Sequence, residues 1–347
     1  MRFYPELACP GNYPLTCMCT LDEPCDAEQA VGAATGICTG RCRQAVSGEC
    51  PGNATCLADG GACAPPPPYK TFTFILQNQG FTGHPGALVY VPSTFNAQVP
   101  NISLVVFIHG FHNCIENVVL PGASGCNCSS DGAYDSAYGL IDSFEAAATA
   151  GTAEGSAVSQ SLLVAIEVTY DEASSDPGRW AVPGLFAAFV TELLSSDHIG
   201  QVIGPRNLSN VNRVRMFSHS GGYNVIGDLA TVGGVAAAIE LTLLDSLYGD
   251  IEAFDSFVQK HIDAKSFGVG AAQARFHSVY TDYGGTEGNN RAMAARVQQW
   301  LSAANQSGLM YYDDTCPRHS WLLTPLCSSG PTQLTTIRVA YFFENCC

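Results

Sequence analysis

Lysine, and charge of either sign, are scarce in this sequence. Only three lysines (Lys70, Lys260 and Lys265) occur among 347 residues, charged residues make up 13%, and the formal net charge is −16. A polyanion such as a nucleic acid backbone, or an anionic membrane, repels such a chain on average. We therefore expect no nucleic acid partner, and the low total charge argues against disorder.

Long apolar runs are also missing. The hydrophobic fraction is 46%, yet no apolar run is long enough to span a bilayer, and no apolar signal core follows Met1. We expect a globular, monomeric protein without a membrane span, and a mature chain from which a signal peptide has been removed. The length suits one large domain and one small domain.

Cysteine, in contrast, is abundant, with sixteen residues. The first 83 residues hold nine cysteines and no histidine, a pattern that favours disulfides over zinc ligation. Disulfides persist in oxidising compartments, so we expect a secreted protein. Five glycosylation sequons agree with secretion, at Asn53, Asn101, Asn127, Asn207 and Asn305.

The cysteines also divide the chain. Residues 1–64 lack long periodic apolar segments and are expected to form a disulfide-stapled module, which we interpret as a stabilising clamp rather than a carbohydrate or polymer binder. Residues 65–68 are four prolines that form a stiff spacer, and residues 69–347 form the large domain. The two parts carry nine and seven cysteines. Full oxidation therefore requires at least one disulfide between them.

From Tyr69 onward, strand and helix patterns alternate, which predicts a mostly parallel sheet with helices on both faces. The expected strands are 71–78, 86–92, 103–108, 161–169, 212–217, 236–244, 275–281 and 308–313. The expected helices are 136–150, 183–196, 221–231, 251–264 and 289–304. The helix over 251–264 has the clearest apolar stripe, with apolar residues at steps of three and four.

The most informative motif is Ser218-His219-Ser220-Gly221-Gly222, between the expected strand 212–217 and the following helix. Small residues two before and two after a serine permit the sharp turn called a nucleophile elbow. Such a turn lifts the hydroxyl clear of the sheet edge. It also aims the first amides of the next helix at the same place, where they can hold negative charge.

Over roughly residues 69–345 the chain resembles the α/β-hydrolase superfamily, particularly its secreted esterases and lipases. The resemblance rests on the elbow, on the run 104–111 with its His109-Gly110 pair, and on His319 after the last expected strand. It implies an α/β fold with an eight-stranded, mostly parallel sheet. It also implies Ser220 as nucleophile, His319 as base, and an oxyanion hole from the backbone N–H groups of Phe111 and Gly221. No cofactor or metal is implied.

Two of these assignments have competitors. His261 and His277 also follow the serine, but they fall inside an expected helix and an expected strand, so His319 in a loop is preferred. For the acid, Asp245 ends a wholly apolar strand, where an unpartnered carboxylate is costly. Chlorophyllases and pancreatic-type lipases place their acid at the corresponding point. Asp282, after the next strand, is the alternative acid, and Glu287 is third.

Several neighbours of the elbow are candidate pocket residues, namely His112, Trp180 and Tyr223, with Phe111 adding to an aromatic wall. We expect His109 to be a buried imidazole that bridges loops. The carboxylates of loop 170–180 fit a solvated rim with helix-capping acids better than a site for calcium or a cationic substrate. The insert 111–135, which carries three cysteines, is a candidate lid.

These features together predict a secreted serine hydrolase that cleaves carboxylic esters through an acyl-enzyme, with an ester as its small-molecule or polymeric partner. The same triad also suits a cutinase-like polyester depolymerase, a lipase or a peptidase. A non-catalytic binding protein on the same fold is the remaining alternative. Nitrophenyl esters, amides and polymer films as substrates would separate the hydrolases.

Overall fold

The computed structural model of the chain describes residues 70–120, 140–149, 158–170, 172–267, 273–280 and 285–305. The expected module 1–64, the proline spacer and the expected strand 308–313 lie outside these residues. So do His319, Asp282 and every cysteine except Cys114.

Seven strands of the described residues form one sheet in the order β1-β2-β4-β3-β5-β6-β7. β2 pairs antiparallel with both β1 and β4, and all other pairs are parallel. This is the strand order of the α/β-hydrolase fold, so the expected fold class is confirmed for the described part. The strands are β1 Lys70–Phe74, β2 Ala87–Val91, β3 Ile102–Ile108, β4 Ser161–Ile166, β5 Val211–His219, β6 Ala238–Leu244 and β7 Arg275–Val279.

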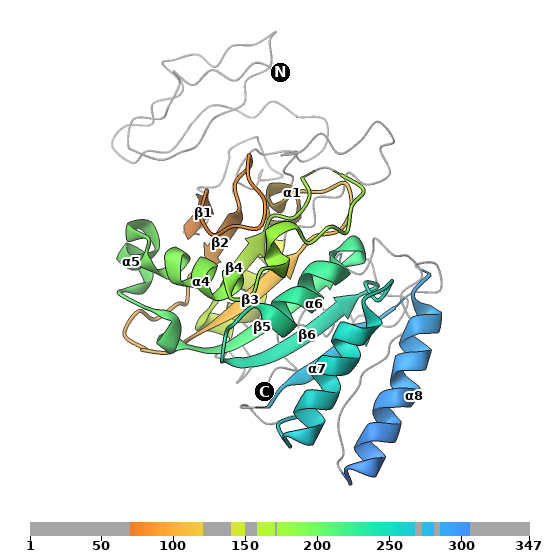
Figure 1. Cartoon of the computed structure of the whole chain (residues 1–347). Coiled ribbons are helices and arrows are strands. Elements are labelled where there is room, and N and C mark those ends of the chain that lie inside the picture. Colours follow the sequence, from red (N-terminus) through yellow and green to blue (C-terminus); the bar gives the residue numbers. More distant parts are fainter. Residues whose placement is uncertain are drawn as a thin grey trace, which may run out of the picture.

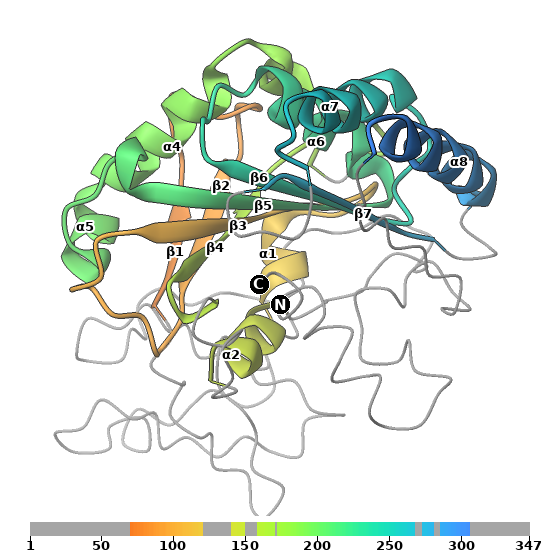
Figure 2. The ribbon, with the colours of Figure 1, turned by 90° about the horizontal axis from the view of Figure 1, so that it is seen from below.

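Helices cover both faces of the sheet (Figures 1 and 2). One face carries α4 Leu185–Ser195, α5 Asp197–Ile203, α6 Tyr223–Val232, α7 Ile251–Asp263 and α8 Glu287–Ala303. The other face carries α1 Ile115–Val119 and α2 Leu140–Thr149. Because side chains alternate along a strand, Leu104 and Val106 of β3 join the core with the first group of helices. Val105 and Phe107 join a second core with α1 and α2.

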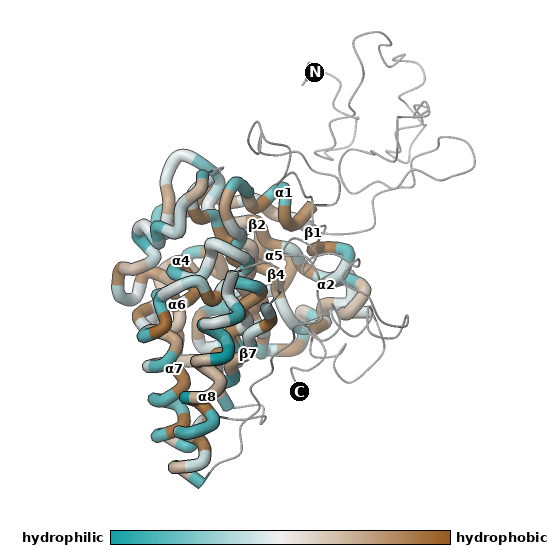
Figure 3. The backbone as a smooth tube through the Cα atoms, turned by 90° about the vertical axis from the view of Figure 1, so that its right-hand side faces the viewer, coloured by the Kyte–Doolittle hydropathy of each residue, from teal (hydrophilic) through white to brown (hydrophobic). Residues whose placement is uncertain are grey.

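Helix formation follows the apolar spacing where the helices are long. In α7 the buried residues are Phe254, Phe257, Val258 and Ile262, as the stripe predicted. Figure 3 shows brown and teal segments alternating along α7 and α8, which lie over the sheet. Among the described helices, none combines the length and the hydropathy that a bilayer crossing needs.

The two shortest helices, α1 and α5, were not predicted, because five and seven residues hardly display a helical period. α1 begins the insert that we expected as a lid. Its residues Ile115, Val118 and Val119 are buried in the second core with α2. This part of the insert therefore packs against the sheet and is not a lid, whereas residues 121–139 lie outside the described ones.

A buried ion cluster lies on β5, β6 and β7. The register places Glu240 between Arg215 and Arg275, and all three are at most 5% exposed. The Glu240 carboxylate accepts a hydrogen bond of 3.0 Å from Arg213, and the other two guanidinium groups lie 3.9–4.0 Å from it. The cluster is several residues before the carboxyl ends of these strands, the edge at which the elbow is formed.

Candidate active site

The turn after β5 has the backbone of a nucleophile elbow. The strand ends at His219, a single turn of 3₁₀ helix covers Ser220–Gly222, and α6 begins at Tyr223. Ser220 has a φ of +50°, in the left-handed region that side-chain-bearing residues seldom adopt. Strain of this kind, about 1–3 kcal/mol, persists where surrounding structure enforces it and is concentrated at functional sites.

The loop after β3 lies directly against this turn, and two glycines make the approach possible. A Cβ atom on Gly110 would lie 2.7 Å from the Cβ of Ser220 and 3.4 Å from the amide nitrogen of Gly221. A Cβ atom on Gly221 would lie 2.2 Å from the ring of Phe111. The structure thus brings Phe111 and Gly221, the two expected oxyanion donors, to the same place beside the serine.

Asp245 is the first residue past β6 and is completely buried. Its φ is +45°, its N–H donates to the carbonyl of Val279 at 2.6 Å, and its carboxylate accepts a short hydrogen bond from the hydroxyl of Thr286. Thr286 is itself buried and immediately precedes α8. The carboxylate is therefore held by the start of a helix.

Ser220 and Asp245 share one edge of the sheet. The last pair of the β5–β6 ladder is His219 with Leu244, so the serine and the aspartate each directly follow the end of their strand. The hydroxyl of Ser246 donates to the carbonyl of Ser220 at 2.7 Å and ties the two turns together. This placement suits an acid and a nucleophile of one site.

The competing residues that the structure describes are engaged elsewhere. His261 lies in α7 with its Nδ1 2.8 Å from the hydroxyl of Ser266, and His277 lies within β7, 3.9 Å from Glu240. Burial lowers the pKa of both imidazoles. Glu287 begins α8, is 42% exposed and pairs with Arg291 at 2.7 Å on the surface.

The three pocket candidates have different outcomes. His112, half-buried, has a φ of +48° and donates its N–H to the carbonyl of Glu172, in the loop after β4. Tyr223, also half-buried, lies at the start of α6 with its ring centre 6.1 Å from that of Tyr248. Tyr223 thus directly follows the turn Ser220–Gly222, whereas His112 joins the loop after β3 to the loop after β4.

Trp180 is a correction, because it is fully buried and belongs to the core instead of a pocket wall. Its ring centre is 5.2 Å from that of Phe189, and its indole N–H donates to the carbonyl of Glu167 at 3.2 Å. The 3₁₀ turn Gly178–Ala181 directs the side chain inward, towards α4. The sequence gave no sign of that direction.

The loop over 170–180 joins the neighbouring elements. The carboxylate of Asp176 accepts from the N–H of Gly178 at 2.8 Å, whereas the N-cap of the 3₁₀ turn is Pro177, with no side-chain capping bond. The carbonyl of Ser175 accepts from the side-chain amide of Asn224, in α6, at 3.0 Å. Within the ranges that the structure describes, no three His, Cys, Asp or Glu side chains gather as a metal ligand set.

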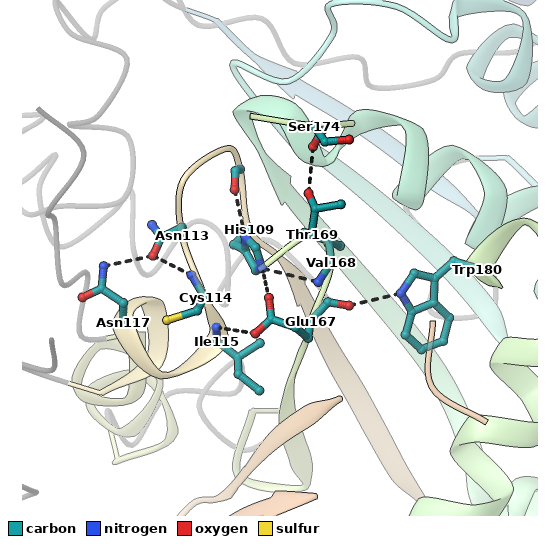
Figure 4. Close-up of polar contacts among 11 residues, drawn as sticks. His109, Asn113, Cys114, Ile115, Asn117, Glu167, Val168, Thr169, Ser174 and Trp180 are labelled. Atoms are coloured by element: carbon teal, nitrogen blue, oxygen red, sulfur yellow. Dashed lines mark hydrogen bonds and ion pairs between the residues drawn. The ribbon is translucent and has the colours of Figure 1, made fainter. Parts of the chain in front are cut away.

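His109 is the buried, loop-bridging imidazole that we expected, and its partner is Glu167 (Figure 4). Its Nε2 lies 2.5 Å from a carboxylate oxygen of Glu167, and its Nδ1 lies 2.8 Å from the carbonyl oxygen of Gly110. Sequence reasoning missed Glu167 because the expected strand 161–169 ran past it, whereas β4 ends at Ile166. The available signal was a carboxylate directly after a strand that ends in apolar residues, as at Asp245.

No family model matches the chain, and no curated protein matches its sequence. Solved structures of similar backbone course include the feruloyl esterase module of Clostridium thermocellum in complex with sinapinate. The match covers 80% of this chain and 88% of that module, with 11% identity and a TM-score of 0.46. Esterase B of Lactobacillus rhamnosis matches over 79% of this chain and 86% of its own, with 11% identity and a TM-score of 0.37. A poly(3-hydroxybutyrate) depolymerase of Bordetella parapertussis matches over 78% and 93%, with 13% identity and a TM-score of 0.42. At these values the likeness transfers no substrate and no residue role to this chain.

Proposed function

We propose that this protein is a serine hydrolase that cleaves carboxylic esters through an acyl-enzyme intermediate. Ser220 is the nucleophile, His319 the general base, and Asp245 the acid that orients the histidine. The observation that carries the proposal is the strained, half-buried Ser220 between β5 and α6, with the loop after β3 packed against its Cβ atom.

The chemistry follows from the roles proposed for these groups. The Ser220 oxygen attacks the ester carbonyl while its proton passes to the imidazole, and the alcohol leaves with that proton. Water then attacks the acyl-enzyme by the same route and releases the acid. In both steps the N–H groups of Phe111 and Gly221 stabilise the negative charge on the carbonyl oxygen, a contribution of about 10²–10³-fold in rate per donor.

We also propose that the enzyme works in an oxidising compartment outside the cell. Cys114, which begins the turn into α1, is fully buried and disulfide-bonded. Disulfides are rare in reducing compartments. The bonded Cys114 supports the count-based expectation that the remaining fifteen of the sixteen cysteines are paired too.

The test is turnover of p-nitrophenyl butyrate together with labelling by a fluorophosphonate. S220A should remove labelling and reduce turnover by about 10⁴-fold or more, because triad members act as a unit. H319A and D245N should reduce turnover by about 10³-fold or more, whereas D282N should leave it within about threefold.

S302A is the matched control, since Ser302 is an exposed serine in α8 that donates to a backbone carbonyl. It should behave as the wild type. Unchanged turnover in S220A contradicts the proposed function. Loss of turnover in D282N with full activity in D245N would instead move the acid to the alternative position.

A further inference from the structure

The carboxylate of Glu167 holds both ends of the loop that follows β3. One oxygen lies 2.5 Å from Nε2 of His109, at the start of the loop, and the other accepts from the N–H of Ile115 at 3.2 Å, where α1 begins. Glu167 is 2% exposed, and its own N–H donates to the carbonyl of Gly86 at 3.1 Å. A buried carboxylate requires such partners, because desolvating an uncompensated charge is costly.

His109 connects Glu167 to a single peptide group, the one between Gly110 and Phe111. Its Nδ1 lies 2.8 Å from the carbonyl oxygen of Gly110, while its Nε2 faces Glu167 and also lies 3.4 Å from the donating N–H of Val168. The Gly110 carbonyl and the Phe111 N–H belong to the same peptide, which is trans and planar. Holding the carbonyl towards the imidazole therefore points the Phe111 N–H in the opposite direction.

This loop needs an external anchor because of the glycine it contains. Gly110 must lack a side chain, since a Cβ atom would lie 2.7 Å from that of Ser220. Glycine, however, allows the adjoining peptides to rotate more freely than any other residue does. Glycine therefore permits the close approach to the serine but does not fix the direction of the next N–H. The contact from His109 fixes that direction.

We propose that Glu167, acting through His109, is a positioning residue that fixes the Gly110–Phe111 peptide so that the Phe111 N–H points at the oxyanion. The inference rests on the ester hydrolysis proposed above. Figure 4 shows the arrangement, with Glu167 between His109 and Ile115. Because the oxyanion exists only in the transition state, loss of this positioning lowers kcat and leaves KM almost unchanged.

The experiment compares E167Q with E240Q by measuring kcat and KM for p-nitrophenyl butyrate. The concentration of active sites used for kcat is the number of sites labelled once the reaction with a fluorophosphonate is complete. Glutamine replaces one carboxylate oxygen with an NH₂ group, so it cannot present an oxygen to both Nε2 of His109 and the N–H of Ile115. We expect kcat in E167Q to fall by about tenfold or more while KM changes by less than about threefold. E240Q is the matched control, because Glu240 is an equally buried, ion-paired carboxylate in the cluster away from the turn. Its kcat per labelled site should equal that of the wild type.

A second pair of variants tests the peptide contact itself and serves if E167Q does not fold. The amide nitrogen of an asparagine takes the place of Nδ1, so H109N keeps a donor for the Gly110 carbonyl, whereas H109A has none. H109N should retain at least about fivefold more kcat than H109A, as expected for one restored hydrogen bond. Combining E167Q with H109A should add no further loss of kcat, because both changes release the same peptide.

The outcomes separate the two proposals. Wild-type kcat in E167Q, equal kcat in H109N and H109A, or multiplicative losses in the double variant each overturn the positioning role. If E240Q loses as much kcat as E167Q, the effect is one of general stability and the inference is also overturned. Turnover that survives in S220A, in contrast, refutes the ester hydrolase itself.

Discussion

Beside the nucleophile, the space available to one methyl group decides whether the site can form. Gly110 is a case in point, because a methyl group there meets the Cβ of Ser220 at 2.7 Å and the carbonyl of His219 at 3.0 Å. We predict that G110A lowers turnover by about tenfold or more and lowers the free energy of unfolding by about 1–3 kcal/mol, as in other overpacked sites. Ester turnover and urea unfolding measure the two effects.

A second glycine supplies the control. Gly200 lies within α5, and apart from the backbone of that helix and its chain neighbours no atom lies within 4 Å of the place where its Cβ would stand. G200A should leave turnover unchanged and raise stability by about 0.5–1 kcal/mol, the usual gain of alanine over glycine in a helix. If G110A were as active and as stable as G200A, the close approach of the loop to Ser220 would be wrong.

Individual residues also show what sequence reasoning can and cannot reach. The elbow was predictable because small residues at fixed spacing leave few other uses for a strand-to-helix turn. Asp245 and Glu167 obey one rule, that a carboxylate at the end of an apolar strand needs a partner, but the rule was applied to one of them only. Trp180 was misplaced because the direction of a loop side chain depends on elements far away in the sequence, here α4.

At the level of elements, the start of α7 carries an electrostatic conflict with α6. Partial desolvation of this largely exposed carboxyl group raises the pKa of Asp250 from an ordinary value of 3.8 to about 6, and the charges of Asp228 and Glu252 add to the rise. The native state therefore binds a proton more tightly than the unfolded chain does between about pH 4 and pH 6. The contribution of this group to stability is present at the acidic end of that interval and is lost as the pH rises through 6.

We predict that D250N is more stable than the wild type above pH 6 and that the difference shrinks as the pH falls to 4. Asparagine also tolerates the left-handed backbone of this residue, whose φ is +53°. Thermal unfolding at pH 4, 5, 6 and 8 measures the difference, and the pH 4 value is the internal control. A difference that stays constant over this range contradicts the electrostatic origin of the effect.

Elements were predictable to the extent that their apolar pattern is long. Strand β3, an almost unbroken apolar run, and helix α7, with its regular stripe, lie where the sequence placed them. The end of β4 was placed too late, because residues 167–169 are buried like those of a strand although they are not paired as one. Burial and pairing cannot be told apart from composition alone.

At the scale of the whole molecule, the sequence constrains connectivity through a count. Nine cysteines lie in residues 1–64 and seven in residues 69–347, and both numbers are odd. The described residues include one of the sixteen, Cys114, and it is disulfide-bonded. If the other thiols are oxidised as well, at least one disulfide must cross the proline spacer at 65–68.

We predict that the two parts stay covalently joined when the spacer is cut. A specific protease site inserted after Pro66 allows cleavage, followed by electrophoresis with and without a reductant. Without reductant the cleaved chain should migrate as one species, and with reductant it should separate into two. The uncut chain treated with the same reductant is the control for changes in shape.

Release of the fragment without reductant, with one free thiol on each part by mass spectrometry, would show that the module is only tethered. A fragment that stays attached would instead show that a disulfide joins residues 1–64 to the large domain. Such a disulfide stabilises the large domain, because a crosslink between distant residues restricts the unfolded chain most.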